Sequence, residues 1–86
     1  MPDKIRATVV SLKGHCNNGH AVGQSWDIES LTPAGICISA FTCIIPAMRV
    51  LRFGGEFPWA KDKGTAQVAC PDAENPVVFE LRRIKS

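Results

Sequence analysis

The uncharged run from Leu31 to Met48 constrains the fold of this 86-residue chain more than any other feature. Apolar residues recur in it at helical spacing, so it predicts one helix that the rest of the chain must bury. Thr32 and Pro33 predict the start of this helix, because threonine caps free backbone N–H groups and proline is tolerated at the first helical position. Gly54 and Gly55 predict its end.

Pro46 lies inside the predicted helix, where it removes one backbone donor. We therefore expect the helix to be kinked at Pro46 or divided into two pieces. The run also approaches the length of a membrane-spanning helix. Its two prolines and its glycine, with Arg49 and Arg52 directly after it, favour a helix buried in a small domain and argue against a membrane role.

Four other segments have the alternation and composition of β-strands. They are Lys4 to Lys13, Gly23 to Glu29, Thr65 to Ala69 and Pro76 to Ile84. A loop rich in glycine and asparagine, 14–20, joins the first two strands, which are therefore expected to form a hairpin or meander. The order strand–strand–helix–strand–strand predicts a small α+β domain (ββαββ) over residues 1–86, with a mostly antiparallel sheet packed on the helix.

Composition and charge narrow the classes of function. Ten Lys and Arg stand against eight Asp and Glu, a net charge of +2, which argues against nucleic-acid binding because such proteins usually carry a strong basic bias. No apolar segment follows the charged N-terminus, so no secretory signal is expected and a cytoplasmic location is predicted. Thiols are kept reduced in the cytoplasm, and the four cysteines therefore favour metal ligands, reactive thiols or small buried side chains over disulfides.

Three of the cysteines lie where predicted elements begin or end. Cys16 follows the first strand, Cys37 lies in the first turns of the helix, and Cys70 closes the third strand. Such ends can meet at one pole of a small fold. A helix N-terminus also favours the thiolate, the form that binds metal or attacks an electrophile. With His20, four residues after Cys16, these cysteines form a candidate tetrahedral zinc site.

Three interpretations of these residues stay open. In the first, Cys16, His20, Cys37 and Cys70 hold zinc, or less favourably an iron–sulfur cluster, in a small accessory or interaction domain. In the second, the same cysteines serve a small thiol-dependent enzyme or redox protein in which His20 is the base. In the third, the thiols only pack in a structural or assembly protein. Cys43 is turned to the other face of the helix and is assigned to packing.

Several surface residues have open roles. His15 either replaces His20 as a ligand or faces solvent. The aromatic loop 53–59 is either a recognition surface, with a larger protein as partner, or a lid on the core. The helix is apolar on two sides, which favours a homo-oligomer. Five basic residues form either an anion-binding patch or a solvated face: Arg49, Arg52, Arg82, Arg83 and Lys85.

These motifs together resemble a widespread family of small prokaryotic proteins. The resemblance spans nearly the whole chain and rests on five motifs: Cys16-x-x-Gly-His20, Thr32-Pro-x-Gly-x-Cys37, Leu-Arg-x-Gly-Gly at Gly54-Gly55, Cys70-Pro-Asp72 and Asn75-Pro-Val-Val-Phe-Glu80. It implies a recurring signature at Cys16, Gly19, His20, Thr32, Pro33, Gly35, Cys37, Cys70, Pro71 and Asp72. The chain departs from the family at Ile36, where leucine is usual, and at Gln24, where aspartate is common. The resemblance implies no activity, substrate or cofactor.

Overall fold

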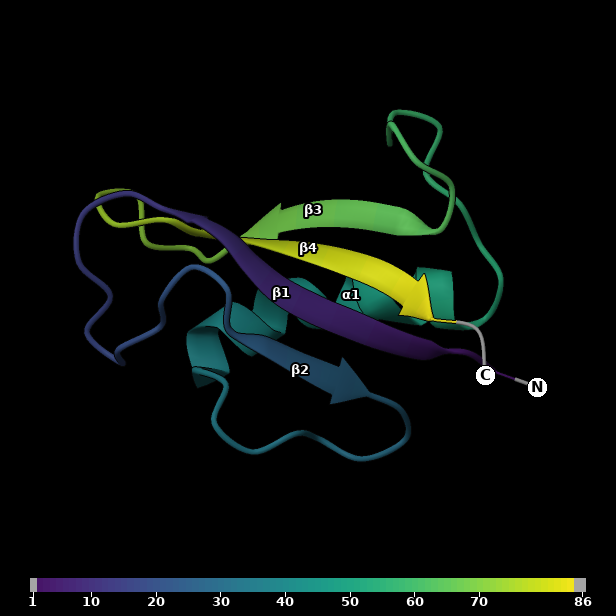
Figure 1. Cartoon of the computed structure of the whole chain (residues 1–86), viewed down its shortest axis with the longest axis horizontal. Helices are drawn as coiled ribbons and strands as arrows, with labels where there is room; N and C mark the ends of the chain where they lie inside the picture. The colour runs from purple at the N-terminus through teal and green to yellow at the C-terminus, as the bar shows by residue number, and fades with distance from the viewer. Residues whose placement is uncertain (1, 85–86) are drawn as a thin grey trace.

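The computed structural model describes residues 2–84, in which one helix covers one face of a four-stranded sheet (Figure 1). The sheet has the order β2-β1-β4-β3, and each pair of neighbouring strands is antiparallel. The elements are β1 (Lys4–Leu12), β2 (Ser25–Ile28), α1 (Ile38–Arg52), β3 (Thr65–Ala69) and β4 (Val77–Ile84). The predicted α+β domain with its ββαββ order is thus confirmed, although β2 is shorter at both ends than the predicted strand.

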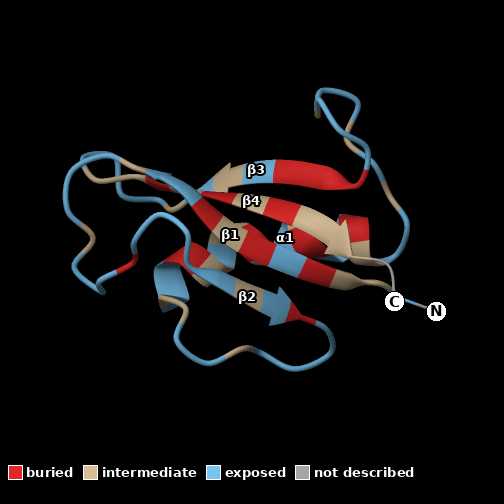
Figure 2. Cartoon of the chain, viewed as in Figure 1, coloured by how far each residue is buried: buried red, intermediate tan, exposed pale blue. Residues whose placement is uncertain are grey.

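The alternation of side chains in the two central strands decides which side of the sheet meets the helix. Ile5, Ala7 and Val9 of β1 are buried, and Phe79 and Leu81 of β4 are buried beside them. In Figure 2 the buried positions of both strands alternate with less buried ones. The alternation read from the sequence therefore gives the correct buried face of the sheet.

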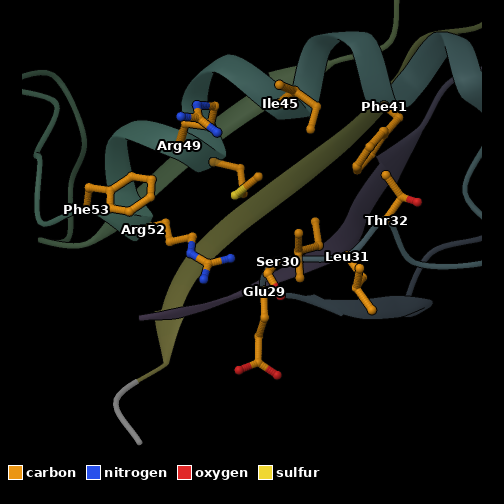
Figure 3. A pocket seen from close by; sticks show the side chains of 11 residues that line it. Glu29, Ser30, Leu31, Thr32, Phe41, Ile45, Arg49, Arg52 and Phe53 are labelled. Atoms are coloured by element: carbon orange, nitrogen blue, oxygen red, sulfur yellow. The ribbon is translucent and has the colours of Figure 1, made fainter. Parts of the chain in front are cut away.

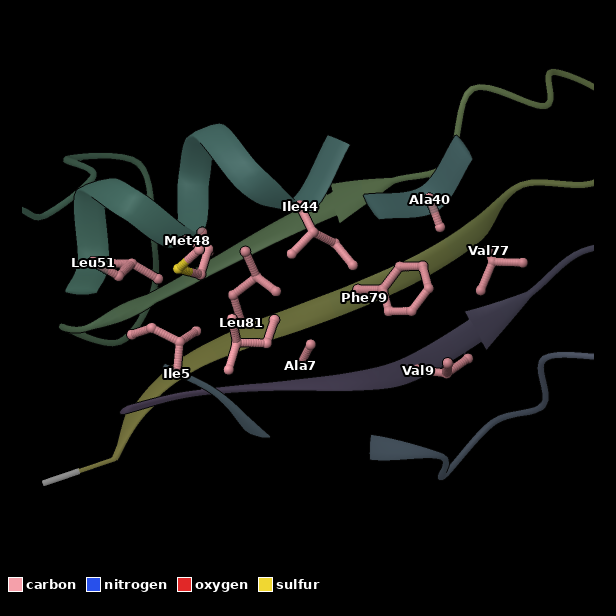
Figure 4. Packing of buried hydrophobic residues seen from close by; sticks show 12 residues of the cluster. Ile5, Ala7, Val9, Ala40, Ile44, Met48, Leu51, Val77, Phe79 and Leu81 are labelled. Carbon is pink, nitrogen blue, oxygen red and sulfur yellow. The ribbon is translucent and has the colours of Figure 1, made fainter. Parts of the chain in front are cut away.

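A stripe of apolar residues joins α1 to this face of the sheet. Ala40, Ile44, Met48 and Leu51 recur every three or four residues and are buried. They point toward the sheet and meet its central strands around Phe79 (Figure 4). Burying a side chain of the size of leucine or isoleucine stabilises a fold by about 1.5–3 kcal/mol, so this stripe supplies most of the helix–sheet attachment.

The helix begins later than predicted. The prediction that it starts at Thr32 and Pro33 is wrong, because Gly35 has a φ of +90°, a left-handed conformation that a helix does not include. The chain is still extended at Cys37, whose ψ is 133°, and Cys37 is the N-cap residue of α1. This boundary places Cys37 directly before the first turn of the helix, and not inside its first turns as predicted.

The end of the helix follows the prediction. Gly54 has a φ of +91°, and the backbone N–H groups of Gly54 and Gly55 donate to the carbonyls of Leu51 and Val50, as in a Schellman motif. Pro46 lies inside α1 without dividing it, so of the two outcomes expected there, two separate pieces are excluded.

The loops that carry the cysteines gather at one end of the sheet. Figure 1 shows residues 13–24, the start of α1 and residues 70–76 together at this end, on the left of the view. A β-bulge between Val9 and Ser11 bends β1 just before it enters the first of these loops. Within residues 2–84, no helix combines the length and the apolarity that a membrane span requires.

Candidate functional site

Three cysteines from separate segments line one hollow at the loop end of the sheet. Cys16 lies in the loop after β1, Cys37 caps α1, and Cys70 directly follows β3. The hollow has a volume of about 230 Å³ and is open to solvent, and each of the three side chains is half-buried. None of the cysteines is in a disulfide, so three thiols are accessible from one small space.

Cys37 has the surroundings of a stabilised thiolate. The backbone N–H of Ala40 is the largest influence that lowers the pKa of the Cys37 thiol, and the N–H of Ser39 adds to it. The side-chain amide of Asn18 donates to Cys37 Sγ at 3.0 Å and also lowers this pKa, whereas burial opposes the effect. A negative charge on sulfur is favoured here because the N–H groups of Ser39 and Ala40 lie at the N-terminus of a helix and the Asn18 amide adds a donor from the loop after β1.

Cys70 is held by the closing turn between β3 and β4. Its sulfur accepts the backbone N–H of Val77 at 3.2 Å, and its own backbone N–H donates to the Val77 carbonyl at 3.0 Å. Asp72 Oδ1 accepts two backbone N–H groups, those of Glu74 and Asn75, which fixes the turn that follows. Cys70 is thereby held at the rim of the hollow by hydrogen bonds on both its backbone and its sulfur.

His20 supports Cys37 through the backbone and not through the sulfur. Its ring is buried, with 5% of the residue exposed, and it makes edge contacts with Trp26 and Phe79 at centroid distances of 5.2 and 6.1 Å. Nε2 accepts the backbone N–H of Cys37 at 3.0 Å. This lone pair is therefore occupied and serves in this arrangement neither as a metal ligand nor as a base for the Cys37 thiol.

The other candidate residues lie outside the hollow. His15 is exposed, and its backbone N–H donates to Asn75 Oδ1 at 2.9 Å, which ties the two loops together. Cys43 is half-buried in the middle of α1 and does not line the hollow. Between residues 2 and 84, no group of three or more histidine, cysteine, aspartate or glutamate side chains is arranged to hold a metal ion. The zinc set of three cysteines and His20 stays a prediction.

Two asparagines of the site were not anticipated from the sequence. Asn18 donates to the Cys37 sulfur, and Asn75 accepts from the loop after β1. In the sequence both are ordinary turn residues, so nothing distinguishes them from Asn17, which also lines the hollow. All three lie within the signature motifs, so position in the sequence does not single out Asn18 or Asn75 either.

The chain matches no protein-family model, and no significant similarity to a curated protein or to a solved structure is found. The chemistry of the site therefore has to follow from its own residues.

Replacing Asn18 by alanine is expected to slow the alkylation of Cys37. The loss of its N–H donor raises the pKa of the thiol, so less thiolate is present near pH 7, and we expect a rate about threefold lower. The rates of the variant and the wild type converge at alkaline pH, above both pKa values. The measurement is the pH dependence of iodoacetamide labelling, followed at each cysteine by peptide mass spectrometry.

Asn17→Ala is the matched control, because Asn17 lines the same hollow but donates no side-chain hydrogen bond to a cysteine in the described residues. Equal effects of the two substitutions on the Cys37 profile would show that Asn18 has no specific influence on the thiol.

Proposed function

We propose that the protein is a small thiol-dependent redox module that exchanges a disulfide with a partner molecule. The observation that carries this proposal is the convergence of Cys16, Cys37 and Cys70 on one open hollow, with N–H donors directed at two of the three sulfurs. At Cys37 these donors favour the thiolate, which is the nucleophile in thiol–disulfide exchange.

Cys37 is the best candidate for the attacking sulfur. Several N–H groups surround it, the helix N-terminus faces it, and its side chain remains partly accessible from solvent. Reactive cysteines typically combine partial exposure with an electropositive environment of this kind. The Cys70 sulfur accepts one backbone N–H, that of Val77. Of the other two cysteines, Cys70 is the one that is followed by a hydrogen-bonded turn.

The exchange proceeds in two balanced steps. The Cys37 thiolate attacks one sulfur of a substrate disulfide, forms a mixed disulfide and releases the other sulfur as a thiolate, which takes up a proton from water. A second cysteine of the hollow, Cys16 or Cys70, loses its proton to water and attacks the Cys37 sulfur. The second half of the substrate leaves as a thiolate that takes up a proton from water, and the protein is left with one internal disulfide.

His20 is a positioning residue in this proposal. It holds the Cys37 backbone through Nε2, so the helix N-terminus and the sulfur keep a fixed relation. The proton of the Cys37 thiol goes to water and not to His20, because that lone pair is already occupied.

The test is the reaction of the reduced protein with 2-hydroxyethyl disulfide near pH 7, followed by intact-protein mass spectrometry. We expect a mixed disulfide and then an internal disulfide, and we expect Cys37→Ser to lower the rate by about tenfold or more. Cys43→Ser is the matched control, since Cys43 belongs to the same helix but lies outside the hollow, and its rate should equal that of the wild type. A Cys37→Ser protein that reacts as fast as the wild type contradicts the proposal.

A second candidate function is the binding of a soft metal ion by the same three cysteines. Thiolates select zinc, copper(I) or an iron–sulfur cluster, and the shared hollow favours such a site. His20 would have to give up its hydrogen bond to Cys37 in order to complete the predicted zinc set through Nε2. A set of three cysteines with an outside fourth ligand keeps this hydrogen bond, but the three side chains would have to move closer together, because no group of three in the described residues is arranged to hold a metal ion.

Elemental analysis of protein purified without chelator tests the metal. The expected result is one zinc per chain, lost in Cys70→Ser and kept in Cys43→Ser; visible absorbance in an anaerobic preparation would indicate a cluster instead. His20→Gln separates the two ligand sets, because loss of zinc in this variant requires His20 as a ligand. Protein without metal, or an unchanged content in Cys70→Ser, removes this candidate.

A further inference from the structure

A second hollow lies along α1, on the side that faces the segment after β2. Its volume is about 280 Å³ (Figure 3). The helix forms one wall, and residues 28–32 form the other. Leu31 on that second wall is 83% exposed, so an apolar side chain stands at the rim with little of its own surface covered.

The helix wall changes from apolar to cationic along its length. Phe41, Ile45, Arg49 and Arg52 are spaced by four, four and three residues, which places them on one face of α1. Met48 forms the floor between the two ends and belongs to the core. A molecule lying in this groove therefore meets apolar side chains at one end and two guanidinium groups at the other.

These two arginines differ from the others that the structure describes. Arg6, Arg82 and Arg83 each form ion pairs with acidic side chains, whereas Arg49 and Arg52 pair with no acidic residue between positions 2 and 84. Lys85, the remaining member of the basic set considered from the sequence, lies outside the described residues. The basic residues do not act as one patch, because Arg82 and Arg83 are already neutralised by neighbours.

Arg52 also has one donor without a partner. Its Nε is buried and has no hydrogen-bond partner within residues 2–84. A buried donor without an acceptor costs about 1–3 kcal/mol. Glu29 also lines the groove, but Figure 3 shows its carboxylate pointing away from the helix, and it forms no ion pair in the described chain.

The position of the arginines at the end of α1 accounts for only part of this arrangement. Cations near a helix C-terminus interact favourably with its dipole, and both guanidinium groups lie over the ring of Phe53, at 5.6 and 5.7 Å. Neither interaction supplies an acceptor for the buried N–H of Arg52. An oxygen anion at this end of the groove would pair with both charges through the terminal N–H groups of the two guanidinium groups, which have no partner in the described residues and, unlike Arg52 Nε, are not buried.

We propose that this groove binds a small amphiphilic anion, an aliphatic chain that ends in a carboxylate. The chain would lie along Phe41 and Ile45, and the carboxylate would accept from the terminal N–H groups of Arg49 and Arg52. With about 280 Å³, the groove is close in volume to the smallest small-molecule sites, which favours a short free aliphatic acid over a peptide segment. This inference is independent of the thiol chemistry at the other end of the helix.

The first test compares octanoate, octanol and octylammonium as probes of the full chain by two-dimensional NMR. Octanoate is expected to shift the methyl signals of Ile28, Ile45 and Met48 and the Nε–H signal of Arg52. Octanol should bind about tenfold more weakly because it lacks the charge, and octylammonium weaker still. Equal binding of octanoate and octanol, or no shift at these groups, overturns the proposal without the need for any variant.

The second test replaces Arg52 by glutamine. Octanoate affinity is expected to fall about tenfold, while octanol affinity stays unchanged. Arg6→Gln is the control, because it removes the same charge from the open side of the sheet, where Arg6 pairs with Asp27. Unchanged octanoate affinity in Arg52→Gln overturns the proposal. Cys37→Ser should bind octanoate like the wild type, so failure of the redox proposal and failure of this one are distinguishable.

Discussion

The hydrogen bond from the Cys37 backbone N–H to Nε2 of His20 determines how the loop end of this protein is built. It joins the loop after β1 to the N-cap residue of α1, two positions that the sequence separates by the whole of β2 and the loops on either side of it. The His20 ring is itself fixed by Trp26 and Phe79, so the start of the helix is attached to the core of the sheet. The orientation of Cys37 toward the hollow depends on this attachment.

The helix is used differently at its two ends. Its N-terminus presents backbone N–H groups to a sulfur, whereas its C-terminus places Arg49 and Arg52 beside an apolar groove. The helix dipole favours both arrangements, because it favours negative charge at the start of the helix and positive charge at its end. Between them, the buried stripe through Ile44 and Met48 holds the helix on the sheet and leaves its second face available for a ligand.

Local patterns in the sequence predicted most of the architecture, because alternation and helical spacing report directly on one buried face. The start of the helix was missed because Thr32 and Pro33 satisfy the rules for a helix start, while the left-handed backbone at Gly35 prevents it. The sequence allowed us to anticipate that Cys16, Cys37 and Cys70 line one hollow, because all three lie near the ends of predicted elements. The role of His20 could not, since residue spacing does not reveal that a ring nitrogen accepts a backbone N–H. The burial of Arg52 Nε without a partner depends on tertiary packing, so it could not be predicted from the sequence either.

The placement of Cys16, Cys37 and Cys70 around one hollow underlies the proposed chemistry, and crosslinking by phenylarsine oxide tests most directly whether their sulfurs can come together. This trivalent arsenical bridges two thiols only when their sulfurs can approach a common atom. Peptide mapping of the reduced protein after one equivalent should find arsenic bridging two of the cysteines at positions 16, 37 and 70, in the wild type and in Cys43→Ser alike. Arsenic bound to single thiols, or bridged through Cys43, would contradict the arrangement described here.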